Sequence, residues 1–212
     1  MMTDRPIVFS APMIRALLDG RKSMTRRVLK PQPTAEFIEA TISADGLTAR
    51  PAALFGSETH KALRRVYRPG DHLWVREEYS FDHSWADVPP RDVIPAAPVW
   101  YWADGNPEGG DWTKPKPGIH MPRWASRLTL IVTDVRVQRL QDISEEDARA
   151  EGVFVPEAQY AQQGSRAPVL AYAGLWEDLN ASRGYGWETN PWVVALTFTA
   201  HRCNIDQMAE AA

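Results

Sequence analysis

The chain has 212 residues, a formal net charge of −3, 44% hydrophobic residues and 24% charged residues. This composition is that of a globular protein with one well-buried core, and it excludes a strongly basic protein that coats nucleic acid. The single cysteine, Cys203, excludes an internal disulfide and a multi-cysteine metal site. Because no apolar run reaches membrane-spanning length and no signal-peptide pattern opens the sequence, we expect a cytoplasmic protein without a membrane partner.

The first thirty residues predict a strand, a helix and a second extended segment. Pro6–Ser10 has the pattern of a short buried strand, and Ser10 is a candidate N-cap for the helix that follows. Apolar residues then recur at helical spacing as far as Gly20, where we expect the helix to end, at Met13, Ile14, Leu17 and Leu18. Thr25–Leu29 is predicted to be extended.

The segment Arg21–Lys30 carries five positive charges and no acid. A helix C-terminus favours cations, but five of them together with a serine and a threonine exceed what capping requires. The cluster suits an anionic or base-edge ligand, although most charge runs are solvated surface. A second basic stretch comprises Lys61, Arg64, Arg65 and Arg68.

The middle of the chain is predicted to hold two insertions separated by a strand. Residues 32–61 form a first insertion, in which Glu39–Arg50 reads as a hairpin around an Asp-Gly pair. The strand His72–Glu77 follows a Pro-Gly-Asp turn. Residues 81–118 form a second, long insertion rich in Trp, Pro and Gly. Its tryptophans favour a lid or a binding segment over disorder.

The C-terminal half contains the strongest strand pattern, Arg127–Leu140, in which the alternation slips near Thr133. A helix capped by Ser144 runs to Glu151 and stops at Gly152. After a polar loop, a second helix spans 170–179 with Leu175, Trp176 and Leu179 on one face, and the last strand is Trp192–Thr199. The sequence therefore predicts an α+β, mostly β protein with two or three short helices, a single domain over 1–203 and a flexible tail at 204–212.

The order of these pieces resembles the ASCH domain family, a group of small β-barrels within the PUA-like superfamily. The matching phrases are Gly20-Arg21-Lys22-Ser23-Met24-Thr25-Arg26-Arg27, Pro69-Gly70-Asp71, and Ile143-Ser144-Glu145-Glu146-Asp147-Ala148-Arg149-Ala150-Glu151-Gly152. The chain is similar in particular to the phage and prophage branch, through Leu73-Trp74-Val75-Arg76-Glu77 and the phrase from Ile119 to Arg127. The resemblance covers nearly the whole chain in order.

The resemblance implies one of two functions. PUA-like barrels have a basic cleft suited to RNA, whereas one bacterial ASCH group hydrolyses the acetyl amide of N4-acetylcytidine with a Lys, a Thr and a Glu. These correspond to Lys22, Thr25 and Glu151. Ser23 replaces a threonine usual in that group, and the insertion 81–118 is absent from the small amidohydrolases. A modified nucleoside or nucleotide is the implied ligand, and RNA is the alternative.

The chemistry of an amide hydrolase accounts for these residue types. The Thr25 hydroxyl needs a base, and Lys22 becomes one if burial and the neighbouring arginines lower its pKa. Glu151 would orient Lys22 or hand a proton to the leaving amine, and Arg26 or a backbone N–H would stabilise the oxyanion. The five histidines show no metal-ligand spacing, so we expect neither a metal nor another cofactor.

Each residue also has a structural explanation. Lys22 would neutralise the helix end, Thr25 would be an ordinary strand residue, and Glu151 would pair with an arginine. The residues that we expect to bind substrate are Arg21, Arg26, Glu77, His120, Arg123 and Trp124. Of these, Glu77 would alternatively pair with Arg76 or Arg127, and Trp124 would alternatively cap the core. An RNA- or modified-base-binding module and a ribonuclease, with Lys22 on a phosphate, are the competing functions.

Overall fold

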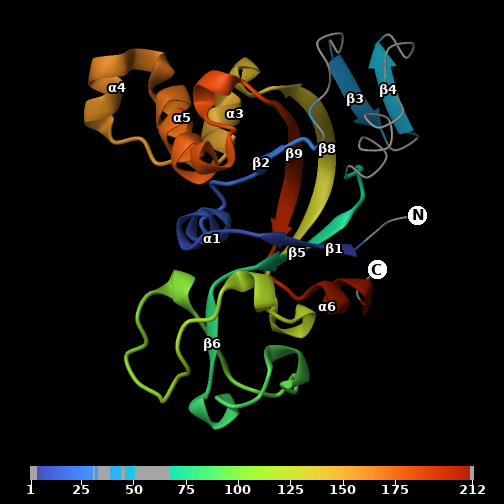
Figure 1. Cartoon of the computed structure of the whole chain (residues 1–212), viewed down its shortest axis with the longest axis vertical. Helices are drawn as coiled ribbons and strands as arrows, with labels where there is room; N and C mark the ends of the chain where they lie inside the picture. The colour runs from blue at the N-terminus through green and yellow to red at the C-terminus, as the bar shows by residue number, and fades with distance from the viewer. Residues whose placement is uncertain (1–3, 31, 33–38, 44–45, 51–66, 211–212) are drawn as a thin grey trace. The chain divides into compact units, whose positions relative to one another are not determined.

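The computed structural model describes residues 4–30, 32, 39–43, 46–50 and 67–210 (Figure 1). The strands are β1 (Asp4–Val8), β2 (Met24–Val28), β3 (Glu39–Ser43), β4 (Gly46–Arg50), β5 (His72–Arg76), β6 (Tyr79–Phe81), β7 (Val99–Tyr101), β8 (Thr129–Arg139) and β9 (Trp192–His201). The α-helices are α1 (Ala11–Leu18), α3 (Glu145–Ala150), α4 (Glu157–Gln163), α5 (Ala167–Asn180) and α6 (Ile205–Glu210).

The chain folds into two compact units. Unit 1 comprises Met1–Gly20, Asp71–Ile131 and Ala200–Ala212; unit 2 comprises Arg21–Gly70 and Val132–Thr199. Strand β8 begins in unit 1 and continues into unit 2, so the division leaves the expected single domain over 1–203 a prediction.

Unit 1 is built on three paired strands. β1 runs parallel to β5, with Asp4 opposite His72, and β5 runs antiparallel to the start of β8, with Leu73 opposite Leu130. Helix α1 begins after Ser10, whose backbone is extended as an N-cap requires, and it buries Ile14, Ala16 and Leu17. The chain leaves this helix through Gly20 at a φ of +72°, a left-handed conformation that glycine adopts without steric cost.

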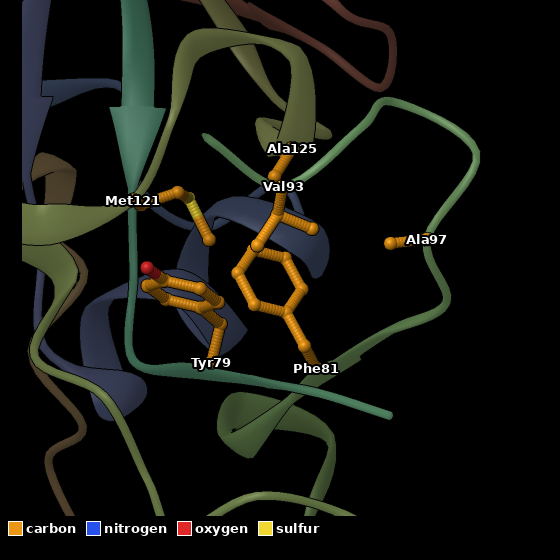
Figure 2. Packing of buried hydrophobic residues seen from close by; sticks show 6 residues of the cluster. All are labelled: Tyr79, Phe81, Val93, Ala97, Met121 and Ala125. Carbon is orange, nitrogen blue, oxygen red and sulfur yellow. The ribbon is translucent and has the colours of Figure 1, made fainter. Parts of the chain in front are cut away.

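The second insertion has a hydrophobic core of its own. β6 pairs with β7, and the buried residues around them are Tyr79, Phe81, Val93, Ala97, Met121 and Ala125 (Figure 2). The ring of Phe81 meets Tyr79 edge-on at 5.1 Å between centroids. Two tryptophans of this insertion donate their indole N–H within it, Trp100 to Gly105 O and Trp112 to Gly109 O, and Trp102 donates to Ser80 Oγ directly before it. These contacts hold together a segment with little regular secondary structure.

Unit 2 combines a sheet with three helices. β2 is antiparallel to β9, with Thr25 opposite Leu196, and β9 also pairs with β8 (Figure 1). The hairpin β3–β4 joins the other half of β8 through β3. Helix α3 contacts both β2 and α5. The buried cluster beneath the helices is Leu140, Ile143, Ala148, Tyr172, Trp176 and Val193.

The α+β, mostly β class is confirmed, and so is the hairpin at Glu39–Arg50. Among the described strands the pairing does not close into a barrel, so the barrel stays a prediction. The slip in β8 is also confirmed, since Leu130 and Val132 are buried before it and Val135 and Val137 after it. Much of the insertion 32–61 and the basic residues 61–65 lie outside the described residues.

The helices differ from the prediction in number and in packing. Five α-helices stand in the described part of the chain, and α4 lies where a polar loop was expected. In α5, Tyr172 and Trp176 are buried whereas Leu179 is 42% exposed, because the aromatic side chains fill the space beside α3. Residues 204–212, predicted as a flexible tail, include α6, which buries Ile205.

Candidate active site

Lys22 is a buried cation two residues before β2, with 1% of its surface exposed. Its Nζ donates to the backbone oxygens of Met24 at 2.8 Å and Glu151 at 2.7 Å, and to Glu151 Oε2 at 3.0 Å. The three N–H groups of an ammonium thus have three acceptors. Lys22 therefore ties the start of β2 to the end of α3.

Glu151 follows α3 as its C-cap and is shared between two cations. Its Oε2 accepts from Lys22, and its Oε1 accepts from Arg26 Nη1 at 3.1 Å. Arg26 also binds Asp147, which in turn accepts from Arg136 Nη2 at 3.1 Å. This cluster of Lys22, Arg26, Arg136, Asp147 and Glu151 therefore holds three cations and two carboxylates, and we call it the lysine cluster.

Burial changes the acidity of the groups in the lysine cluster. It lowers the pKa of Lys22 below the ordinary 10.5; the Glu151 carboxylate opposes this shift, and the charges of Arg27 and Arg26 add to it. Tyr172 lies beside Glu151, and burial followed by the Glu151 charge raises the pKa of its hydroxyl well above 10. Lys22 thus loses its proton more readily than a lysine in water, as a general base must.

Thr25 lies on β2, three residues after Lys22, and is 3% exposed. Because side chains alternate along a strand, Thr25 and Arg27 share one face of β2, and Met24 and Arg26 share the other. No hydrogen bond between described residues engages the Thr25 hydroxyl. The Thr25 hydroxyl is therefore buried and, among the described residues, has no hydrogen-bond partner.

Arg26 and Arg21 were both predicted to bind substrate. The Arg26 side chain has no exposed surface, yet among the described residues its Nε has no hydrogen-bond acceptor. A buried donor without a partner costs free energy, and a ligand oxygen would recover it. Arg21 is exposed and donates to Gly152 O at 3.2 Å, directly after Glu151. Arg26 thus belongs to the lysine cluster, and Arg21 adjoins it.

Glu77, by contrast, belongs to unit 1 and is paired there with Arg127. Arg127 donates to both Glu77 oxygens at 2.9 Å and also binds Asp104, at 2.7 and 2.8 Å. Its guanidinium lies 4.1 Å from the centroid of the Tyr101 ring. Burial raises the pKa of Glu77, and the Arg127 hydrogen bond opposes the shift. The structure thus shows the alternative that was expected for Glu77, an ion pair with Arg127.

The remaining predicted residues also lie in unit 1. His120 is exposed, and its backbone oxygen accepts from Tyr79 Oη at 3.0 Å. Arg123 donates to Asp4 and Asp206, both at 2.7 Å, and so links β1 to α6. Trp124 stacks on Phe81 with 5.7 Å between ring centroids, and so caps the insertion's core. These contacts account for the residues structurally, and their role in substrate binding stays a prediction.

Sequence reasoning missed Tyr172 as a neighbour of the site. Its four-residue separation from Trp176 places both on one helical face, and that spacing was the available signal. The described residues contain no group of three His, Cys, Asp or Glu side chains placed to hold a metal ion. None of the helices in the described part of the chain is long and apolar enough to cross a membrane.

The described residues define an α+β protein with a buried Lys–Glu–Arg cluster, and Thr25 follows Lys22 three residues later, on β2. No family model matches the sequence, and no curated protein matches it. Among solved structures, the chain is similar to the protein EF3133 from Enterococcus faecalis, described as a DUF984 protein, at 11% identity and a TM-score of 0.43. The match covers 97% of this chain and 84% of that one, but it is too weak to support a functional argument.

Proposed function

We propose that this protein is an ASCH-type hydrolase that removes an N4-acyl group, such as acetyl, from a modified cytosine nucleoside or nucleotide without a metal. The observation that carries the proposal is the buried Lys22, whose pKa is lowered and whose Nζ donates to Glu151 Oε2. Thr25 follows Lys22 three residues later, on β2. The proposal retains the PUA-like barrel and the cytoplasmic location that the resemblance and the sequence favour.

The proposed reaction has two halves. In the first, neutral Lys22 takes the Thr25 hydroxyl proton as the oxygen attacks the acyl carbon, and a backbone N–H near Thr25 donates to the developing oxyanion. The C–N4 bond then breaks, the proton passes from Lys22 to N4, and an acyl ester remains on Thr25. In the second half, water attacks this ester, Lys22 relays the water proton to the departing Thr25 oxygen, and the carboxylic acid is released.

Two observations favour a second candidate, an RNA- or modified-base-binding module without turnover. All three N–H groups of the Lys22 ammonium already have acceptors, as in a structural ion pair. In addition, strand alternation places Thr25 on the face of β2 opposite Arg26. A ribonuclease, with Lys22 on a phosphate, has no separate observation in its favour.

The test is release of cytidine from N4-acetylcytidine by the purified chain. We expect Thr25→Ala and Lys22→Met each to lower kcat/KM by about a thousandfold or more, because nucleophile and base act as one unit. Thr199→Ala, an exposed threonine on β9, is the matched control and retains activity. A folded wild-type protein without turnover would contradict the proposal. RNA binding that weakens steeply with salt would then support the module.

A further inference from the structure

Strand β2 lies at an edge of its sheet among the described strands. It pairs with β9 on one side, and no described strand pairs with its other side. Every second residue of an edge strand directs its backbone N–H and C=O away from the sheet, where these groups need another partner. The hydrogen bonds around β2 show which of its residues do so.

The hydrogen bonds at the two ends of β2 fix this alternation. Before the strand, Phe198 N donates to Ser23 O at 2.9 Å, and after it Leu29 N donates to Trp192 O at 2.9 Å. Both bonds continue the register of β2 on β9. In an antiparallel ladder, every second pair of opposite residues exchanges hydrogen bonds. The odd-numbered residues of β2 therefore turn their N–H and C=O groups to β9, and the even-numbered residues turn theirs outward.

Thr25 and Arg26 consequently differ in the direction of their backbone groups. Thr25 directs its N–H to Leu196, the residue opposite it in the ladder. Arg26 directs its N–H and C=O to the open edge, and no hydrogen bond between described residues engages either group. Arg26 as a whole is nevertheless only 4% exposed. A buried N–H without a partner costs free energy, and an acceptor on a ligand would recover it.

The Arg26 N–H is also the outward donor nearest to the Thr25 hydroxyl along the chain. Its nitrogen is bonded to the carbonyl carbon of Thr25. The outward N–H groups of Met24 and Val28 lie further along the strand, and the Arg26 side chain with its Nε lies on the face opposite Thr25. In α/β-hydrolases, the N–H of the residue after the nucleophile likewise forms part of the oxyanion hole.

We infer that the backbone N–H of Arg26 binds the acyl oxygen of the substrate and is the oxyanion-hole donor for attack by Thr25. As the Thr25 oxygen bonds to the acyl carbon, an electron pair of the C=O bond moves onto the acyl oxygen, and the N–H stabilises the charge there. The inference rests on the proposed function and names the donor that its first step needs. Binding of an acyl oxygen at this N–H does not itself require turnover.

An amide-to-ester substitution at Arg26 tests the inference. It replaces the backbone N–H by oxygen and keeps the arginine side chain, but it weakens the Thr25 carbonyl as an acceptor. We expect kcat for N4-acetylcytidine to fall by about a hundredfold to a thousandfold, as for loss of one oxyanion-hole donor.

The same substitution at Val28 is the matched control. It also removes an outward N–H, and it weakens the carbonyl of Arg27, which turns to β9 as that of Thr25 does. This ester should retain kcat, because its missing N–H lies two residues further from Thr25. Equal kcat values of the two esters would overturn the inference.

An NMR titration tests the same contact without turnover. In the Thr25→Ala chain, N4-acetylcytidine should move the Arg26 amide proton downfield, because a new hydrogen bond deshields it. Cytidine, which lacks the acyl oxygen, should not, and the Val28 amide proton should stay unchanged with either ligand. An Arg26 signal that does not move with N4-acetylcytidine, or that moves equally with cytidine, would contradict the contact.

The two experiments separate failure of the inference from failure of the reaction. Wild-type turnover that survives in the Arg26 ester overturns the inference and leaves the hydrolase standing. If the wild type has no turnover, a shift of the Arg26 amide proton that is specific to N4-acetylcytidine supports the acyl-oxygen contact and overturns the hydrolase.

Discussion

Glu151 and Glu77 are both carboxylates with almost no exposed surface, 3% and 1%, but the charges around them are balanced in opposite ways. In the lysine cluster, one carboxylate serves both Lys22 and Arg26. Around Glu77, one guanidinium, that of Arg127, serves two carboxylates. Burial lowers the pKa of Lys22 although Glu151 opposes the shift, whereas the hydrogen bonds of Arg127 to Glu77 and Asp104 outweigh its burial and raise its pKa. The first arrangement suits proton transfer, and the second holds a permanent ion pair in place.

The largest effect on stability is expected at Arg127. Arg127→Ala leaves Glu77 buried without its cation, which should cost about 3–5 kcal/mol in the free energy of unfolding. Urea denaturation measures the loss. Arg91→Ala, in which the arginine of an exposed pair is removed, is the control and should cost about 1 kcal/mol or less. A loss as small as this in Arg127→Ala would mean that the pair does not support unit 1.

A smaller loss of stability is expected at Lys22. In Lys22→Met the Glu151 carboxylate keeps Arg26, and burial of a charged amine is no longer required, so we expect a cost of about 2 kcal/mol or less. Activity should nevertheless be lost if the proposed reaction holds. A variant as unstable as Arg127→Ala would instead assign Lys22 the same structural role as Arg127.

Arg123 is expected to contribute less to stability than Arg127 or Lys22. Its side chain is 37% exposed, so the pairs with Asp4 and Asp206 should contribute about 1 kcal/mol. Arg123→Ala should therefore lower the stability only slightly, as measured by urea denaturation. A retained kcat/KM for N4-acetylcytidine would favour its structural role, whereas a rise in KM would support the predicted contact with substrate.

The smallest expected effect is the pH dependence of stability, which shows whether burial or Glu151 dominates the pKa of Lys22. The pKa of Lys22 in the folded chain lies below its unfolded value of 10.5, so between these two values the unfolded chain binds more protons. The free energy of unfolding therefore rises with pH across this window. Below the window Lys22 is charged in both states, and the full cost of burying its charged amine lowers the stability. We expect the free energy of unfolding of wild type, minus that of Lys22→Met, to increase from neutral pH towards pH 10.5. A decrease would show that Glu151 outweighs burial.

Local pattern was enough to predict most elements. The alternation in β8, the Ser144 cap and the hairpin at Glu39–Arg50 each depend on residues a few positions apart, and all three are present. The packed face of α5 was predicted only in part: Trp176 is buried as expected, but Leu179 is exposed, because the helical spacing of the apolar residues fits more than one face. Contact with α3 and the buried cluster selected Tyr172 and Trp176.

The sequence by itself determined the α+β class and the basic segment after α1, and its resemblance predicted Lys22, Thr25 and Glu151 as site residues, of which the structure brings Lys22 and Glu151 together. Only the tertiary structure decided which charges each buried carboxylate meets. Lys22 and Glu151 lie 129 positions apart, and Glu77 and Arg127 lie 50 apart. Ion pairs over such separations depend on strand pairing and helix packing, which local periodicity does not encode. The difference between an amine with a lowered pKa and a fixed guanidinium therefore arises from the folded arrangement.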